Sequence, residues 1–297
     1  REMKAVERVA ETISWFPGHM YRAHKLMREK IKWIDVFIEV RDARVPLASK
    51  NIEIDMMLEE FKKPKIIIFN KYDLCNQRIT NQYIENLKKA KIESIAVSAE
   101  NKKNISKILG LAKSIKPIKY NTVGMWLMIG GMPNVGKSSI INALRKQATT
   151  LSHKDVTKAT STPCQTTYVT GFKINEDPLA FLVDTPGVMV PRITDQEVGL
   201  KLALVGCIRD KIVDKEILIQ YLFEVLHKQK LFKYVEKYSM EKPCQNYHEV
   251  LRRVNTKYSH HNMEATYDLI LSHFREGLLG KLTIDDITLG MDSTETR

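Results

Sequence analysis

Residues 131–138 read GMPNVGKS and match the phosphate-binding pattern GxxxxGK[ST] at every fixed position. The apolar run at residues 126–130 is typical of a buried strand, and the apolar spacing of residues 138–144 predicts a helix after the loop. A glycine-rich loop between a strand and a helix binds phosphate because its backbone N–H groups and the helix N-terminus attract the anion. This segment therefore predicts an α/β sheet that carries a polyphosphate ligand.

The loop also supplies side chains with separate tasks. Lys137 would reach the outer phosphates, and Ser138 would ligate Mg²⁺. Glycine at position 136 lets the backbone turn toward the ligand, and we expect the neighbouring positions to contact it as well. The loop positions expected to bind nucleotide are Asn134, Val135, Gly136, Lys137, Ser138 and Ser139.

Residues 70–73 read NKYD and resemble the NKxD motif with which GTPases select guanine. Asp73 would accept two hydrogen bonds from the N1–H and the exocyclic amine of guanine, which adenine lacks. An adenine base would leave this carboxylate unpaired, and an unpaired polar group makes the wrong base costly. Asn70 and Lys71 would brace the loop, with the stem of Lys71 lying along the base.

A second segment supports the base-binding loop. Ser98 and Ala99 follow an expected strand at residues 94–97 and resemble the SA[KE] loop that backs the guanine base in GTPases. Both base-binding segments precede the phosphate loop here, whereas ordinary GTPases carry them after it. The reversed order predicts a circularly permuted GTPase domain that binds GTP and GDP.

Asp184 and Gly187 belong to a DTPG sequence that follows an apolar run and matches the DxxG element of GTPases. Asp184 would hold Mg²⁺ through a water, and the Gly187 N–H would sense the γ-phosphate. A switch threonine that closes over Mg²⁺ and the γ-phosphate is expected between the phosphate loop and this element. We choose Thr166, because residues 163–166 resemble the PGxT pattern found in this class of GTPases. Thr167 is the alternative.

Two further segments carry a family resemblance. Residues 15–20 read WFPGHM and residues 41–47 read RDARVPL. With the order of the motifs, they make residues 14–280 resemble the YlqF/RbgA-type GTPases, in particular the branch called mitochondrial ribosome-associated GTPase 1. The resemblance implies a factor for late assembly of the large ribosomal subunit, which docks on ribosomal RNA with GTP bound and leaves on hydrolysis. It also implies ribosomal proteins as neighbours.

The group that activates water is not evident from the motifs. Val188 stands where Ras-type enzymes carry a glutamine, so we expect slow hydrolysis by the protein alone. Lys137 and Thr166 would stabilise the transferred phosphoryl group. Asn134 would add a K⁺ ligand, as in potassium-dependent GTPases, or only stabilise the loop. His19 resembles a histidine proposed as catalytic in this family, and the alternative is that it caps a helix or binds ribosomal RNA.

Composition limits the kinds of partner and the compartments that are expected. The net charge of +12 indicates a polyanionic partner, because Lys and Arg displace counterions from phosphate backbones. Four cysteines without a CxxC pair argue against a zinc site or a disulfide framework and favour a reducing compartment. No apolar run is long enough to span a membrane. A lysine-, isoleucine- and asparagine-rich sequence that does not begin with methionine favours the mitochondrial matrix, with an upstream targeting segment, over the bacterial cytoplasm.

The chain divides into four expected parts. Residues 1–31 form a lead-in, and residues 32–197 form the circularly permuted P-loop GTPase domain, an α/β fold with a doubly wound, mostly parallel sheet. Residues 198–290 form a small all-helical domain that binds RNA or the ribosome, with apolar residues at helical spacing over residues 214–235. Residues 291–297 form a polar tail. We expect a monomer.

Other classes of protein fit less well. A GTP-dependent regulator of another RNA or protein partner is the alternative to ribosome assembly. Signalling GTPases normally keep the unpermuted order, the catalytic glutamine and a lipidation motif, and this sequence has none of these. A small-molecule kinase needs neither of the base-binding segments.

Overall fold

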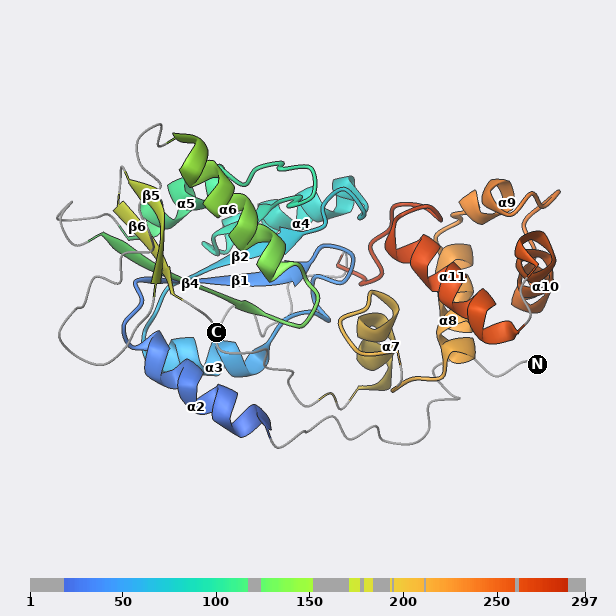
Figure 1. The fold of residues 1–297 in the computed structure, drawn as a ribbon, viewed down its shortest axis with the longest axis horizontal. Coiled ribbons are helices and arrows are strands. Elements are labelled where there is room, and N and C mark those ends of the chain that lie inside the picture. Colours follow the sequence, from blue (N-terminus) through green and yellow to red (C-terminus); the bar gives the residue numbers. More distant parts are fainter. Residues whose placement is uncertain are drawn as a thin grey trace.

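The computed structural model describes residues 19–116, 124–151, 171–176, 179–183, 193, 195–210, 212–259 and 262–287. Figure 1 shows two parts side by side, a sheet covered by helices and a group of helices. The helical group begins after α7, which lies between the two parts. An α/β part followed by a helical part is the architecture predicted from the sequence.

Six strands form one sheet in the order β3-β2-β1-β4-β6-β5. All neighbouring pairs are parallel except β5 and β6, which are antiparallel. The strands are β1 (Val36–Asp42), β2 (Lys65–Asn70), β3 (Ser94–Ala96), β4 (Met125–Gly131), β5 (Gly171–Glu176) and β6 (Leu179–Val183). The mostly parallel sheet confirms the expected fold class, and the antiparallel edge strand β5 is an element that the sequence pattern did not reveal.

Helices cover both faces of the sheet, and its central strand β1 is therefore buried on both sides. All of β1 is buried, with Phe37 packing into one apolar cluster and Ile38 into another. The cluster around Phe37 also takes residues from α2 (His19–Ile31) and α3 (Ile52–Glu60), and the cluster around Ile38 takes residues from α5 (Lys107–Ile115) and α6 (Lys137–Leu151). In Figure 1, α2 and α3 lie below the sheet and α6 lies above it. The remaining helix, α4 (Gln77–Lys89), packs on β2 and β3.

The helical region comprises α8 (Lys215–Lys228), α9 (Lys233–Lys237), α10 (Tyr247–Tyr258) and α11 (Met263–Arg275). Both α10 and α11 pack against α8. Residues 214–235, whose apolar residues have helical spacing, form α8 and the start of α9. Helix α8 ends at Lys228 because Lys230 adopts a left-handed φ of 55°, and the Leu231 N–H donates to the Leu226 carbonyl at 2.9 Å.

The chain after α11 turns back onto the α/β part. The Asp285 carboxylate accepts hydrogen bonds from the backbone N–H groups of Leu47 and Ala48, at 2.8 and 3.0 Å. The Ile284 N–H donates to the carbonyl of Arg44 at 2.7 Å. These bonds anchor the end of the helical region beside the end of β1.

One apolar cluster runs through both parts of the molecule. It includes strand residues such as Val40 and Ile129 and helical residues such as Leu222 and Phe274. The expected boundary between residues 197 and 198 falls inside α7 (Gln196–Leu204), which packs on α8. No helix in the described part of the chain is long and apolar enough to cross a membrane.

Candidate functional site

The phosphate loop lies between β4 and α6, as the motif predicted. Gly131 has a φ of +141° and Gly136 a φ of +95°, which are left-handed conformations that favour glycine. A Cβ on Gly131 would collide with the carbonyl oxygen of Val40, because β1 runs directly beside this turn. The loop is therefore packed against the carboxyl end of the sheet, where parallel α/β folds bind ligands.

The Lys137 side chain folds into this loop. Its Nζ donates hydrogen bonds to the carbonyls of Met132 and Gly131, at 2.6 and 3.2 Å. Burial lowers the pKa of this ammonium to about 8. Ser138 and Ser139 are exposed in the first turn of α6, which contains no acidic residue. A cation, two hydroxyls and a helix N-terminus thus meet at one place, which suits a polyphosphate and its metal ion.

Asn70 joins three of the predicted nucleotide-binding segments. Its Nδ2 donates to the Val135 carbonyl of the phosphate loop at 2.8 Å, and its Oδ1 accepts from the Ala99 N–H at 3.1 Å. Gly136 is needed for this approach, because a Cβ there would collide with Nδ2 of Asn70. The structure therefore brings the NKxD, SAE and phosphate-loop segments together although they are far apart in the sequence.

The rest of the base-binding loop follows directly on β2. Lys71 has a left-handed backbone, with a φ of 61°, and its Nζ pairs with the Asp42 carboxylate at 2.9 Å. Asp73 is half-buried two residues later. Ser98 is buried, and its Oγ accepts a hydrogen bond from the Asn101 N–H at 3.2 Å, which shapes the SAE turn.

Asn134 has a partner that the sequence did not reveal. Its exposed side chain donates to the carbonyl of Gly206, in the turn after α7, at 2.8 Å. Arg275 of α11 holds the same turn, because its guanidinium donates to the carbonyls of Leu204 and Ala203 at 3.1 and 2.9 Å. A cation at the last carbonyls of a helix is a favourable cap. The phosphate loop is thus linked through this turn to the helical region.

Several predicted site residues lie outside the described part of the chain. These are the switch threonine Thr166 and the DxxG residues Asp184 and Gly187. The described strand β6 ends at Val183, directly before Asp184, and pairs with β4. His19 is the first residue of α2, and its side chain is among those that are not described.

Asp42, which sequence reasoning did not single out by itself, contacts the predicted base-binding loop through Lys71. Residues 42, 70–73 and 98–99 together are called the base end of the site. The Asp42 carboxylate is fully buried at the end of β1 and accepts from Arg44 Nε and Nη2 at 2.9 and 2.8 Å, in addition to its pairing with Lys71. Burial alone would raise the pKa of this carboxyl, but Arg44 and Lys71 hold it well below its usual range. The one available signal was the position of Asp42 within the segment 41–47 that carries the family resemblance.

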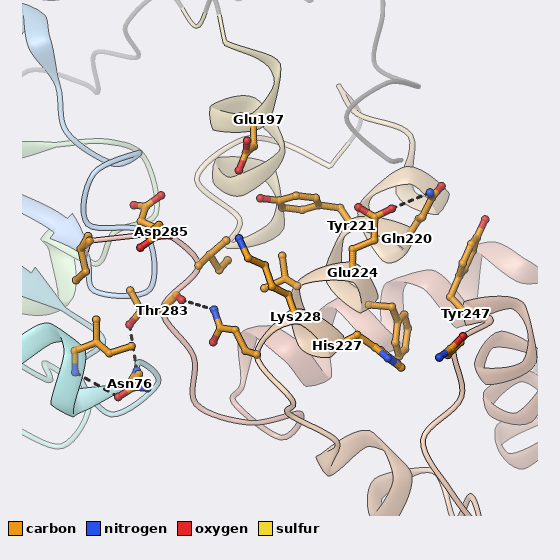
Figure 2. A pocket seen from close by; sticks show the side chains of 18 residues that line it. Asn76, Glu197, Gln220, Tyr221, Glu224, His227, Lys228, Tyr247, Thr283 and Asp285 are labelled. Atoms are coloured by element: carbon orange, nitrogen blue, oxygen red, sulfur yellow. Dashed lines mark hydrogen bonds between the residues drawn. The ribbon is translucent and has the colours of Figure 1, made fainter. Parts of the chain in front are cut away.

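A separate hollow of about 1000 Å³ lies between α8 and residues 283–287 (Figure 2). Glu224 and Lys228 of α8 line it, opposite Asp285. Thr283 stands at its edge, where its Oγ1 accepts from the Asn76 N–H at 3.3 Å. None of the residues predicted to bind nucleotide lines this hollow, so it belongs to the joint between the two parts of the molecule.

Residues 21–194, more than half of the chain, match the family RsgA GTPase. The chain belongs to the RsgA GTPase family. A solved structure described as GNP-bound YlqF from T. maritima shares the fold of this GTPase, with a TM-score of 0.63 at 20% identity over 89% of this chain and 97% of that one. The expectation of a circularly permuted GTPase that hydrolyses GTP is therefore confirmed.

Curated relatives match this RsgA-family GTPase over nearly their whole length. The Aedes aegypti protein named mitochondrial GTPase 1 is 35% identical, over 93% of this chain and 94% of the relative. The Xenopus tropicalis protein named mitochondrial ribosome-associated GTPase 1 is also 35% identical, over 93% and 95%. The Bacillus cereus protein named ribosome biogenesis GTPase A is 31% identical, over 92% and 93%.

Proposed function

We propose that this GTPase assists assembly of the large ribosomal subunit in mitochondria, docking on ribosomal RNA with GTP bound and leaving after hydrolysis. The observation that carries the proposal is the similarity, over more than nine tenths of both chains, to relatives named for ribosome association and ribosome biogenesis. Relatives named as mitochondrial support the compartment, and the matrix is where mitochondrial ribosomal RNA is found.

The charge of the chain supports an RNA partner. The net charge is +12, and the surface of the helical region carries many cationic side chains. The exposed ones among residues 228–257 are Lys228, Lys230, Lys233, Lys242, Arg252, Arg253 and Lys257. Phosphate contacts of this kind give affinity that falls steeply with salt. Binding of the free protein to ribosomal RNA should therefore weaken as the salt concentration rises.

The nucleotide would be held as the motifs indicate. Asp73 would read the guanine edge, Lys137 would bind the outer phosphates, and Ser138 would ligate Mg²⁺. The switch residues Thr166 and Asp184 would complete the metal site. The N–H of the glycine at position 187 would contact the γ-phosphate, and Val188 offers no hydrogen bond to the attacking water.

The remaining catalytic help would come from Asn134 of the phosphate loop and from a group outside the nucleotide motifs. Asn134 would help to hold K⁺ once nucleotide is bound, giving up its hydrogen bond to the Gly206 carbonyl, and the cation would supply positive charge near the phosphates. His19, at the first position of α2, would orient the water, or a group of the ribosome would do so. A site completed by a ribosomal group would keep turnover slow until the subunit is bound.

Nucleotide state would reach the helical region through α7. This helix starts nine residues after the DTPG sequence and ends in the turn that contacts Asn134 and Arg275. Closure of the switch over the γ-phosphate would pull on the start of α7 and shift the turn at its end. The helical region would follow because Arg275 grips that turn.

The test is GTP turnover in potassium buffer with purified mitochondrial large subunits, small subunits or neither. We expect stimulation of at least about tenfold by the large subunit only, since completed GTPase sites gain far more than this. The Lys137→Ala variant should not bind GTP tightly, so its turnover measures the activity of contaminating GTPases. Turnover that neither subunit changes would refute the proposal and favour a regulator of another RNA or protein partner.

A further inference from the structure

The carboxylate of Asp42 lies where the guanine loop begins. Asp42 is the last residue of β1 and stands opposite Asn70, the last residue of β2. Its Oδ2 pairs with the Nζ of Lys71 at 2.9 Å. The Lys71 side chain is 24% exposed while the Asp42 side chain is fully buried. The ammonium is therefore anchored to a carboxylate in the interior, while part of the lysine side chain is exposed.

The carboxylate itself has little freedom to move. Its Oδ1 accepts from the N–H and Nε of Arg44 at 3.0 and 2.9 Å, and its Oδ2 accepts from Nη2 at 2.8 Å. Arg44 is buried too, and it donates onward to the Val205 carbonyl at 3.2 Å and the Arg275 carbonyl at 3.4 Å. A paired, fully hydrogen-bonded guanidinium and carboxylate of this kind hold one geometry.

A second ion pair on the same strand provides an internal comparison. Glu39 is equally buried and pairs with Arg41 at 2.9 Å, with the same spacing of two residues. Its further partners are Lys65, at 3.2 Å, and the Asn51 N–H, at 3.1 Å. These partners belong to the start of β2 and the start of α3, away from the guanine loop. The two pairs share their architecture and differ in the third group that each carboxylate holds.

We propose that Asp42 is a positioning residue for guanine recognition: it fixes the ammonium of Lys71 so that the lysine stem lies ready along the base. This inference rests on the proposed roles of Lys71 and Asp73 at the base. A lysine stem loses rotamer freedom when it packs on a ligand. Fixing its ammonium before the nucleotide arrives removes that cost from binding, which is the general effect of preorganisation.

The test is a double-mutant cycle on affinity for a fluorescent GDP analogue, measured by titration of the full chain at constant Mg²⁺. Asp42→Asn and Lys71→Met should each weaken binding by about tenfold, and the double variant should bind about as weakly as either single one. An additive loss of about a hundredfold in the double variant would overturn the proposal, since Asp42 would then act by another route. Unchanged affinity in Asp42→Asn would overturn it as well.

Glu39→Gln is the matched control, because it removes a buried carboxylate from the same strand and leaves the guanine loop untouched. It should lower thermal stability while affinity for the GDP analogue stays the same. An equal loss of affinity in Glu39→Gln would overturn the proposal, because general loosening of β1 would then explain both. Should Asp42→Asn fail to fold, Asp42→Glu keeps the buried charge, moves it by one methylene and enters the same cycle.

The proposed function and the inference fail in different ways. A GDP analogue that does not bind the unaltered chain, or that ADP displaces as well as GDP does, would overturn the guanine site itself. Selective GDP binding combined with independent effects of positions 42 and 71 would overturn only the positioning role.

Discussion

The base end and the phosphate end of the nucleotide site are built in opposite ways. At the base end, Asn70, Asp42 and Ser98 are buried, and each accepts a hydrogen bond from a backbone N–H. At the phosphate end, the side chains of Asn134 and Ser138 are exposed. The first region is thus fixed by buried hydrogen bonds, whereas the second exposes polar side chains at the surface.

This difference suggests separate tasks: the base end would select the nucleotide, and the phosphate end would respond to it. Groups fixed by the fold before binding discriminate between bases at no cost of reorganisation. Groups at the phosphate end are those proposed to respond to Mg²⁺, K⁺, pH and the turn that follows α7. Changes at the base end should therefore alter affinity under all conditions, and changes at the phosphate end should depend on the conditions used.

The largest effect is expected from Lys137→Ala. This change removes the half-buried cation of the phosphate loop, and affinity for Mg·GTP should fall by about a thousandfold. Equilibrium titration with a fluorescent GTP analogue measures it. Lys146→Ala, an exposed lysine of the same helix, is the control and should bind normally. Micromolar affinity retained by Lys137→Ala would remove this residue from the phosphate site.

The next effect belongs to the base end. Asp73→Asn should weaken GTP binding by about a hundredfold and improve binding of xanthosine triphosphate, whose base offers a carbonyl where guanine has an amine. Competition titrations with GTP, xanthosine triphosphate and ATP measure the change, and ATP should remain a poor ligand throughout. If guanine selectivity is unchanged, the assignment of Asp73 is wrong.

A smaller effect should appear as the pH rises. Burial lowers the pKa of Lys137 to about 8, so its ammonium discharges above that pH in the free protein, whereas bound phosphate favours the charged form. Affinity for GDP should be constant below pH 8 and should fall above it, by up to about tenfold per pH unit. Titrations between pH 7 and 9.5 test this. A profile that is flat to pH 9.5 would contradict the lowered pKa.

The smallest effect is expected from Asn134→Ala. This variant should lose the stimulation of GTP turnover by K⁺ over Na⁺, which we expect to be about fivefold, while nucleotide selectivity stays unchanged. Steady-state turnover in matched K⁺ and Na⁺ buffers measures it. Equal turnover of the unaltered protein in both salts would exclude the cation role.

Contiguous motifs made the phosphate loop predictable. Strand, glycine turn and helix follow one another within residues 125–151, so local chemistry identifies the loop and its neighbours. The order of the motifs then predicted the permuted fold, and the comparisons bear this out. The edge strand β5 escaped prediction because GFKINE has only two apolar residues, so its alternation of apolar and polar residues is too short to indicate a strand.

Long-range contacts were beyond the sequence pattern. Strand β1 buries the charged residues Arg41 and Asp42, which the sequence pattern does not predict because charged residues are rarely buried unless they are paired. Their burial depends on partners such as Lys71, which β2 brings into register. The bond between Asn134 and Gly206 joins residues 72 positions apart, and no local spacing encodes it.

The apolar cluster that runs through both parts of the molecule has a consequence for how the protein unfolds and moves. Since strand and helix residues share one interior, each part buries apolar residues of the other, and the chain should melt in a single cooperative transition. Removing the helical region would expose to solvent the apolar residues of the α/β part that pack against it. Any motion between the two parts should then be a small rotation about this shared apolar interface. It should not be a large independent displacement of two linked domains.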